Sequence, residues 1–189
     1  MRESFKALLL ETGREGMQDL INWLETETDF YQAPASTKFH GSVAGGLLEH
    51  SVAVCRELNA LAGRYCQGTP PASLTIVSLL HDLCKVNFYK KGYRNKKNDL
   101  TGQWEKVEIY EVEDQMPIGH GEKSVIIAMK FIKLTDEEIA AIRWHMGGYD
   151  DGARGGFGSG QALANAYEKY PLAVALNMAD LATSFIRKL

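Results

Sequence analysis

The sequence has little cysteine, and its cysteines are not arranged for structural cross-links. The three residues, Cys55, Cys66 and Cys84, are odd in number and form no Cys-x-x-Cys pair. This excludes a disulfide framework and a zinc site built from thiolates. Reduced, buried thiols are typical of a cytoplasmic protein, so we predict that location and no chemical role for the cysteines.

Long apolar runs and a large excess of one charge are also absent. No stretch approaches the roughly 18 apolar residues that a membrane span needs, and the apolar run within residues 1–16 is too short for a signal sequence. The 21 basic and 24 acidic side chains give a net charge of −3, which provides no global attraction to nucleic acid or anionic membrane. The length of 189 residues and 45% hydrophobic content predict a single globular domain over 1–189.

Most of the chain has the spacing of amphipathic helices, with apolar residues recurring every three or four positions. Thr135 followed by Glu138 is a capping box, which starts a helix. Pro171 suits the first turn of the last helix. We predict an all-α fold in which residues 1–39 form a helical N-terminal extension. The helices are expected at about 15–28, 42–65, 74–84, 119–132 and 135–146. A short helix that ends at 169 and a last helix over 171–189 follow.

Residues 88–113 break the helical pattern and predict a β-hairpin inserted into the bundle. Five of its eight positions 90–97 are basic, with Tyr89 and Tyr93 close by. These residues could attract a phosphorylated substrate and stack on a base, or could simply form a charged solvent face that discourages aggregation. The acidic run Glu105–Asp114 argues against a broad nucleic-acid groove. An exposed hairpin could also support a homodimer.

Residues 147–160 contain seven glycines in fourteen positions. This composition predicts a flexible loop, and a loop of this length inside a compact domain is often functional. It could serve as a lid over a site. Arg154 is then a candidate phosphate contact.

Histidine and aspartate carry the chemical information in this sequence. His81 and Asp82 lie side by side in an apolar segment, and Asp180 is also flanked by apolar residues. A buried carboxylate is costly unless it is paired or bound to a metal. A lone histidine on an apolar helix face is more often a hydrogen-bonded core residue. Several helices that each contribute such residues are, however, how helical bundles build metal sites.

The ordered set of these residues resembles the signature of the HD-domain superfamily of metal-dependent phosphohydrolases. The resemblance spans about residues 40–186 and implies an HD-type helical bundle. Gly45–Val52 and Leu79–Val86 are similar to typical family segments. His120–Val125 and Arg143–Gly148 look like segments of small bacterial and phage members. The matching residues are His50, His81, Asp82, His120, His145 and Asp180.

The resemblance implies one or two divalent metal ions. One ion would be held by His50, His81, Asp82 and Asp180, and a second by His120 and His145 with Asp82 bridging. Imidazole and carboxylate ligands favour Fe, Mn, Zn, Ni or Co. A water activated by such ions would hydrolyse a nucleotide or another small phosphate ester.

Other residues are candidates for contact with the substrate. Lys85, three residues after Asp82, matches a family lysine that contacts phosphate, although it could simply cap a helix. Lys91 and Arg94 of the hairpin are candidate substrate-binding residues. His40 lies roughly 12–15 Å from His50 along a helix axis, so it would line the mouth of the substrate site or lie on the surface. Glu49 and Glu122 flank ligands and would orient them or remain solvated.

Three alternatives to a small-molecule phosphohydrolase stay open. The first is a phosphodiesterase that cleaves cyclic or short oligonucleotides, which would need a wider groove lined by the hairpin. The second is a dinuclear-iron oxygenase of the same fold, since fold does not fix chemistry. The third is a non-catalytic module that binds a nucleotide. In none of them do we expect a membrane partner.

Overall fold

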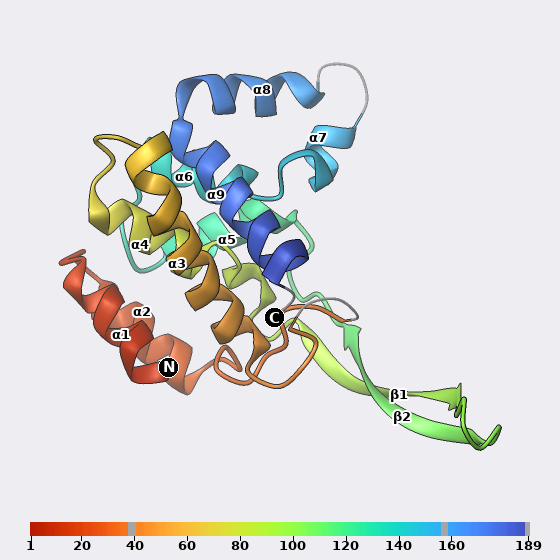
Figure 1. Ribbon diagram of the computed structural model, residues 1–189. Coiled ribbons are helices and arrows are strands. Elements are labelled where there is room, and N and C mark those ends of the chain that lie inside the picture. Colours follow the sequence, from red (N-terminus) through yellow and green to blue (C-terminus); the bar gives the residue numbers. More distant parts are fainter. Residues whose placement is uncertain (38–40, 156–158, 188–189) are drawn as a thin grey trace.

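The protein is described by a computed structural model over residues 1–37, 41–155 and 159–187, and most of it is helical (Figure 1). This confirms an all-α fold with one small antiparallel hairpin. Short 3-10 turns lie at Leu83–Lys85 and Gly147–Tyr149, and a π-helical segment covers Ala182–Arg187. The α-helices are α1 (Arg2–Glu11), α2 (Met17–Thr26), α3 (Gly46–Tyr65), α4 (Pro71–Leu80), α5 (His120–Met129), α6 (Asp136–Trp144), α7 (Asp151–Arg154), α8 (Ser159–Lys169) and α9 (Pro171–Leu181).

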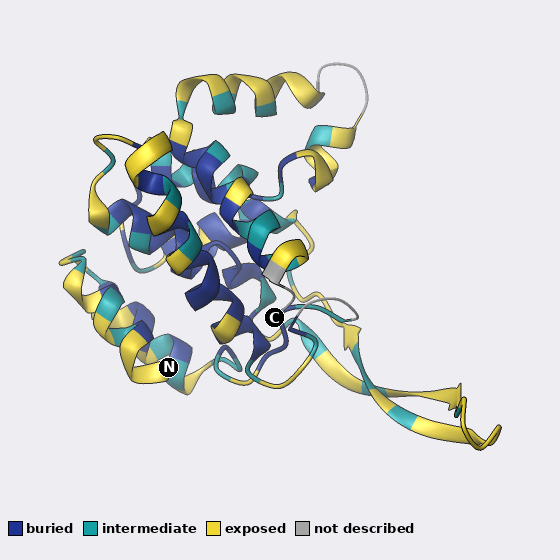
Figure 2. Cartoon of the chain, in the orientation of Figure 1, coloured by how far each residue is buried: buried dark blue, intermediate teal, exposed yellow. Residues whose placement is uncertain are grey.

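The core forms where α3 packs against α4 and α9, and where α6 packs against α9 and α5. These central helices are the most deeply buried parts of the chain (Figure 2). Leu47, Val54 and Leu58 of α3 are fully buried. Each such side chain stabilises the fold by roughly 1.5–3 kcal/mol, so α3, which carries His50, is anchored in the core.

Glu138 ties the N-terminal helices to the bundle. It is fully buried in the first turn of α6, where it completes the predicted capping box with Thr135. Arg14, between α1 and α2, donates hydrogen bonds of 2.9 and 2.7 Å to its two carboxylate oxygens. Ser73 of α4 donates another at 2.7 Å. One side chain therefore joins α6, α4 and the N-terminal segment.

The predicted hairpin is confirmed as β1 (Tyr89–Lys97) and β2 (Trp104–Val112). The strands are antiparallel, in a register that pairs Tyr89 with Val112 and Lys97 with Trp104. The hairpin extends away from the bundle as an arm (Figure 1), and most of its residues are exposed (Figure 2).

Three predicted helix boundaries differ most from the structure. α3 begins at Gly46 rather than near residue 42, because Gly45 has a φ of 79° and turns the chain into the helix. α4 ends at Leu80 rather than continuing to residue 84. α9 ends at Leu181, where a π-helical segment replaces the expected α-helix.

The prediction of a flexible loop over 147–160 is also wrong for most of the segment. Gly147–Tyr149 form a 3-10 turn, α7 follows, and α8 begins at Ser159. The local cause is Asp150, whose carboxylate accepts a hydrogen bond from the backbone of Gly152 and caps α7. Arg143 donates to the same carboxylate at 2.9 Å and fixes it to α6.

Among the described residues, no helix is both long and apolar enough to cross a bilayer.

Candidate metal centre

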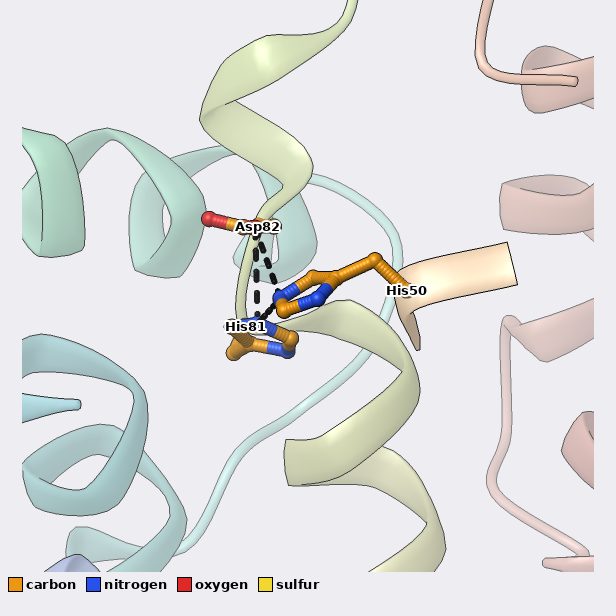
Figure 3. Close-up of side chains that lie close together, drawn as sticks. All are labelled: His50, His81 and Asp82. Atoms are coloured by element: carbon orange, nitrogen blue, oxygen red, sulfur yellow. Dashed lines mark hydrogen bonds and ion pairs between the residues drawn. The ribbon is translucent and has the colours of Figure 1, made fainter. Parts of the chain in front are cut away.

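The end of α4 brings two consecutive side chains into one cluster. Neighbouring residues in an α-helix point about 100° apart, so an unbroken helix would separate His81 from Asp82. The helix instead stops at Leu80, and Asp82 has a φ of −103° and a ψ of 21° before a 3-10 turn. The His81 Nε2 atom then lies 3.4 Å from the Asp82 Oδ2 atom. Figure 3 shows both side chains in contact with His50 of α3, while one oxygen of Asp82 points away from His50.

The two carboxylate oxygens of Asp82 face different pairs of histidines. Oδ2 lies 3.6 Å from His50 Nε2 and 3.4 Å from His81 Nε2. Oδ1 lies 2.9 Å from His120 Nε2 and 3.6 Å from His145 Nε2. Asp82 is therefore the only carboxylate among the described residues that contacts all four of these histidines.

Asp180 of α9 completes the cluster on the side of His50. Its Oδ1 atom lies 3.1 Å from His50 Nε2. Burial by itself would raise the pKa of the Asp180 carboxyl, but the hydrogen bond and charge of His50, with smaller effects of His81 and His145, hold that pKa well below its usual value. The carboxylate is thus ionised and available as a ligand at neutral pH.

Backbone carbonyls orient two of the histidine rings. The Nδ1 atom of His81 donates to the Ser78 carbonyl at 2.8 Å, and the Nδ1 atom of His145 donates to the Ile142 carbonyl at 2.7 Å. Because Nδ1 of each ring is directed to a backbone carbonyl, the Nε2 atom points into the cluster. His145 Nε2 is buried and has no hydrogen-bond partner among the described residues. This nitrogen atom is therefore available to coordinate a metal ion.

A close approach between α5 and α6 brings His120 to His145. The rings lie 5.2 Å apart between centroids. A Cβ atom on Gly121 would overlap the backbone carbonyl of Arg143, so the next residue after His120 must be glycine for the helices to approach this closely. Burial lowers the pKa of His120 despite its hydrogen bond to Asp82, which favours the neutral form that binds metals.

Neighbouring groups stabilise the ionised form of the Asp82 carboxylate. Burial would raise the pKa of its carboxyl, but the Lys85 ammonium, the His81 ring and the hydrogen bond from His120 outweigh burial and keep that pKa well below its ordinary value. The Lys85 Nζ atom lies 2.7 Å from Asp82 Oδ2. The carboxylate is therefore ionised although it is almost completely buried.

These donors fit a divalent transition metal. Three groups each place their donor atoms within 4.8 Å of one another: His50, His81 and Asp82; His81, His145 and Asp180; and Asp82, His120 and His145. Imidazole nitrogens combined with carboxylate oxygens suit Fe, Mn, Co, Ni or Zn better than Mg, which prefers oxygen ligands. The buried His/Asp cluster can thus hold a metal ion, as the sequence predicted.

A cavity of about 540 Å³ opens onto this cluster. Asp82, Asp180 and His120 line it together with Lys85. Most of its remaining lining is apolar or aromatic and comes from distant segments: Ala35, Tyr89, Val112, Met146, Tyr149, Leu181 and Phe185. The polar remainder is Ser36, Thr37, Asn177 and Ser184. Lys85 is the only cationic side chain among the described lining residues.

Several candidate substrate contacts lie away from this cavity. Lys91 and Arg94 line a different cavity, beside the hairpin, and Lys91 pairs with Glu108 at 2.9 Å. The two cavities share Thr37 in their linings. Arg154 donates to the Gly148 carbonyl at 2.8 Å. His40 lies outside the described residues.

The two glutamates that flank ligands also have other environments. Glu49 is exposed on α3. Glu122 pairs with Arg143 at 2.5 Å. Neither belongs to the groups of donors that could hold a metal ion.

Cys84 and Asn177 contact the cluster, although neither was predicted to belong to it. The Cys84 Sγ atom lies 3.4 Å from the ring nitrogens of His120. Burial raises the pKa of this thiol to about 12, so it packs there as a neutral group. Asn177 Nδ2 donates to the His145 carbonyl at 2.6 Å. Asn177 lies three residues before Asp180, and that spacing on α9 is the one signal that could have identified it.

Comparisons with known proteins found no match: no family model, no curated protein and no solved structure is similar to this chain.

Proposed function

We propose that the protein is a metal-dependent phosphohydrolase of the HD type that acts on phosphate esters. The observation that carries the proposal is the position of Asp82, whose two oxygens face separate histidine pairs at the end of an open cavity. A carboxylate with donors on both sides suits a site for two ions, as in many enzymes of phosphoryl transfer. The order of the donors along the chain, which resembles the HD signature, supports the same assignment.

The proposed ligands divide around Asp82. His50, His81 and Asp180 would bind an ion on the Oδ2 side of Asp82. His120 and His145 would bind an ion on the Oδ1 side. When bound, divalent transition metals polarise a phosphoryl oxygen and lower the pKa of water, which supplies a nucleophile near neutral pH. The hydrogen bonds that His81 Nδ1 and His145 Nδ1 donate to the Ser78 and Ile142 carbonyls keep the Nε2 atoms directed into the cluster.

Lys85 is the proposed phosphate-binding residue. Burial would lower the pKa of its ammonium, but the adjacent Asp82 carboxylate outweighs burial and raises that pKa. The side chain is therefore positively charged at any pH the enzyme meets. Because it lines the cavity beside Asp82, it can bind a phosphate oxygen and stabilise the charge that develops on it.

The test combines metal analysis with a hydrolysis assay. Metal-free protein is loaded in turn with Mn, Fe, Co, Ni or Zn, bound metal is measured by elemental analysis, and release of phosphate or p-nitrophenol is followed for mononucleotides, p-nitrophenyl phosphate and its bis-ester. We expect bound metal and hydrolysis of at least one ester class. Asp82→Asn should lose both, whereas the matched control Asp136→Asn, an exposed carboxylate on α6, should keep both.

The Lys85→Gln variant separates metal binding from phosphate binding. It should keep its metal and lose turnover, since the ammonium is not a metal ligand. Metal-loaded protein that hydrolyses none of these esters would overturn the proposal. So would hydrolysis that survives both Asp82→Asn and thorough chelation.

The apolar walls of the cavity favour a second candidate, a dinuclear-iron oxygenase. A single lysine among the described lining residues supplies little positive charge to balance a phosphate that carries several negative charges. Tyr149, Leu181 and Phe185 would instead suit an apolar substrate. Oxygen uptake by iron-loaded protein, with no ester hydrolysis under any metal, would favour this candidate.

A further inference from the structure

The two faces of the hairpin arm differ in composition. Residues paired across an antiparallel register point to the same face, and successive pairs alternate. One face, here called the aromatic face, is defined by the pairs Tyr89–Val112, Lys91–Tyr110, Tyr93–Glu108, Asn95–Lys106 and Lys97–Trp104. The opposite face carries Lys90–Glu111, Gly92–Ile109, Arg94–Val107 and Lys96–Glu105 and has no aromatic residue.

The aromatic face is exposed and interleaved with cations. Tyr93 is 59% exposed and Trp104 is 72% exposed. The Lys106 Nζ atom lies 4.4 Å from the centre of the Tyr93 ring. Within the described residues, no carboxylate lies within ion-pairing distance of Lys97 or Lys106. Large exposed aromatics beside unpaired lysines suggest a partner with both flat rings and negative charge.

This face is continuous with the metal cavity. Tyr89 and Val112, which pair at the base of the arm on the same face, both line the cavity that contains Lys85 and Asp82. Tyr89 also packs toward Tyr110, with ring centroids 6.4 Å apart. A nine-residue strand spans about 30 Å, so the arm extends about this far beyond its base (Figure 1).

The register also separates the acidic residues that argued against nucleic acid in the sequence. Glu105 and Glu111 fall on the opposite face, where they are paired across the strands with Lys96 and Lys90. Glu108 is on the aromatic face, but it forms an ion pair with Lys91 at 2.9 Å. The aromatic face therefore carries three lysines, Lys91, Lys97 and Lys106, against the single carboxylate of Glu108.

We propose that the aromatic face binds single-stranded nucleic acid and directs a strand into the metal cavity. Bases would stack on Tyr93 and Trp104, and phosphates would contact Lys97 and Lys106. Unpaired bases are required because only they expose flat faces to an aromatic side chain. A protein partner would account less well for rings that alternate with lysines.

This inference rests on the proposed function for its chemistry and narrows the substrate to a phosphodiester. In the reaction, the oxygen of water forms a bond to phosphorus and the bond from phosphorus to one sugar oxygen breaks. That sugar oxygen leaves with a proton, and the other product keeps the phosphate. No oxidant or reductant takes part.

The test measures binding without catalysis. Fluorescence anisotropy of a fluorescein-labelled oligothymidylate of about twelve nucleotides is recorded at low salt in the presence of EDTA, which prevents any metal-dependent cleavage. We expect binding that weakens with salt. Tyr93→Ala and Trp104→Ala should each weaken it roughly 5- to 150-fold, as expected for the loss of one stacked base.

Lys96 and Lys97 provide a matched pair, because they are adjacent, exposed and equal in charge but lie on opposite faces. Lys97→Ala should weaken binding and reduce its salt dependence, whereas Lys96→Ala should change binding much less. Equal losses in the two variants would mean diffuse attraction to charge and would overturn the proposal.

Two other outcomes would also overturn it. The first is no binding by the wild-type protein. The second is a dimer, measured by light scattering, that Trp104→Ala dissociates while oligothymidylate binding is absent, which would make the face a self-association surface. Ester hydrolysis without oligonucleotide binding would reject this inference and keep the proposed function. Binding without metal uptake or hydrolysis would reject the proposed function and keep the aromatic face.

Discussion

Graded loss of metal from the cluster is the most direct consequence of the geometry around Asp82. With donors on both sides of one carboxylate, loaded wild-type protein should hold about two equivalents of metal. Asp82→Asn removes the charge shared by both sides and should leave close to none. His120→Ala removes a donor from the Oδ1 side alone. The groups containing His50 and Asp180 remain intact, so about one equivalent should be retained.

The structure also predicts how much stability the Asp82 variants lose when no metal is bound. Lys85 lies 2.7 Å from Asp82 and its side chain is 12% exposed. Asp82→Asn leaves this ammonium buried without its carboxylate, which should cost about 3 kcal/mol. At this chain length that is a fall in Tm of roughly 6–12 °C. The double variant Asp82→Asn/Lys85→Met removes both charges and should recover most of the stability but none of the metal.

Elemental analysis after gel filtration and thermal unfolding in EDTA measure these two quantities. The double variant ensures that missing metal is not a result of misfolding. Equal metal content in Asp82→Asn and wild type would refute the assignment of Asp82 as the shared ligand. Complete loss of metal in a well-folded His120→Ala variant would refute the division into two sides.

Four further outcomes follow from the structure. Arg14→Met should destabilise the protein by about 3 kcal/mol in urea unfolding, because it leaves the buried Glu138 carboxylate without its cation. The Arg14 guanidinium and other donors lower the pKa of Glu138 against the effect of burial. Its contribution is therefore complete above the unfolded pKa of about 4.3 and declines as pH falls through the lower folded pKa, so the stability deficit of Glu138→Gln should shrink in acid. Gly121→Ala should separate α5 from α6 and reduce metal content, since its methyl group overlaps the Arg143 carbonyl; unchanged metal would contradict this account of the approach. Metal added at about one hundred times its Kd should stabilise the chelated protein by about 2.7 kcal/mol in calorimetry, and this gain should vanish at a pH low enough to protonate His120.

The local features of the fold could be predicted from sequence. The capping box at Thr135, the start of the last helix at Pro171 and the hairpin within 88–113 depend on residues close to one another in the chain. Periodicity was less informative where backbone geometry changes without a change in hydrophobicity. The end of α4 at Leu80 is such a case, because the apolar pattern continues through the break.

The glycine-rich segment shows the limit of composition. Seven glycines predicted a flexible loop, but Asp150 caps α7 and is itself held by Arg143 of another helix. A contact between elements therefore overrides the local preference. Only the tertiary structure could reveal it.

The sequence by itself determined which residues have the chemistry of metal ligands and in what order they occur. Six histidines and aspartates on separate helical segments were enough to predict a buried cluster, because such groups are costly in a core unless they are paired. The tertiary structure alone decided that the two oxygens of Asp82 face different histidines. It also placed Lys91 and Arg94 at a second cavity and turned the aromatic residues of the arm to one face. These features depend on the directions of side chains that distant segments bring together, and the linear order of residues does not specify those directions.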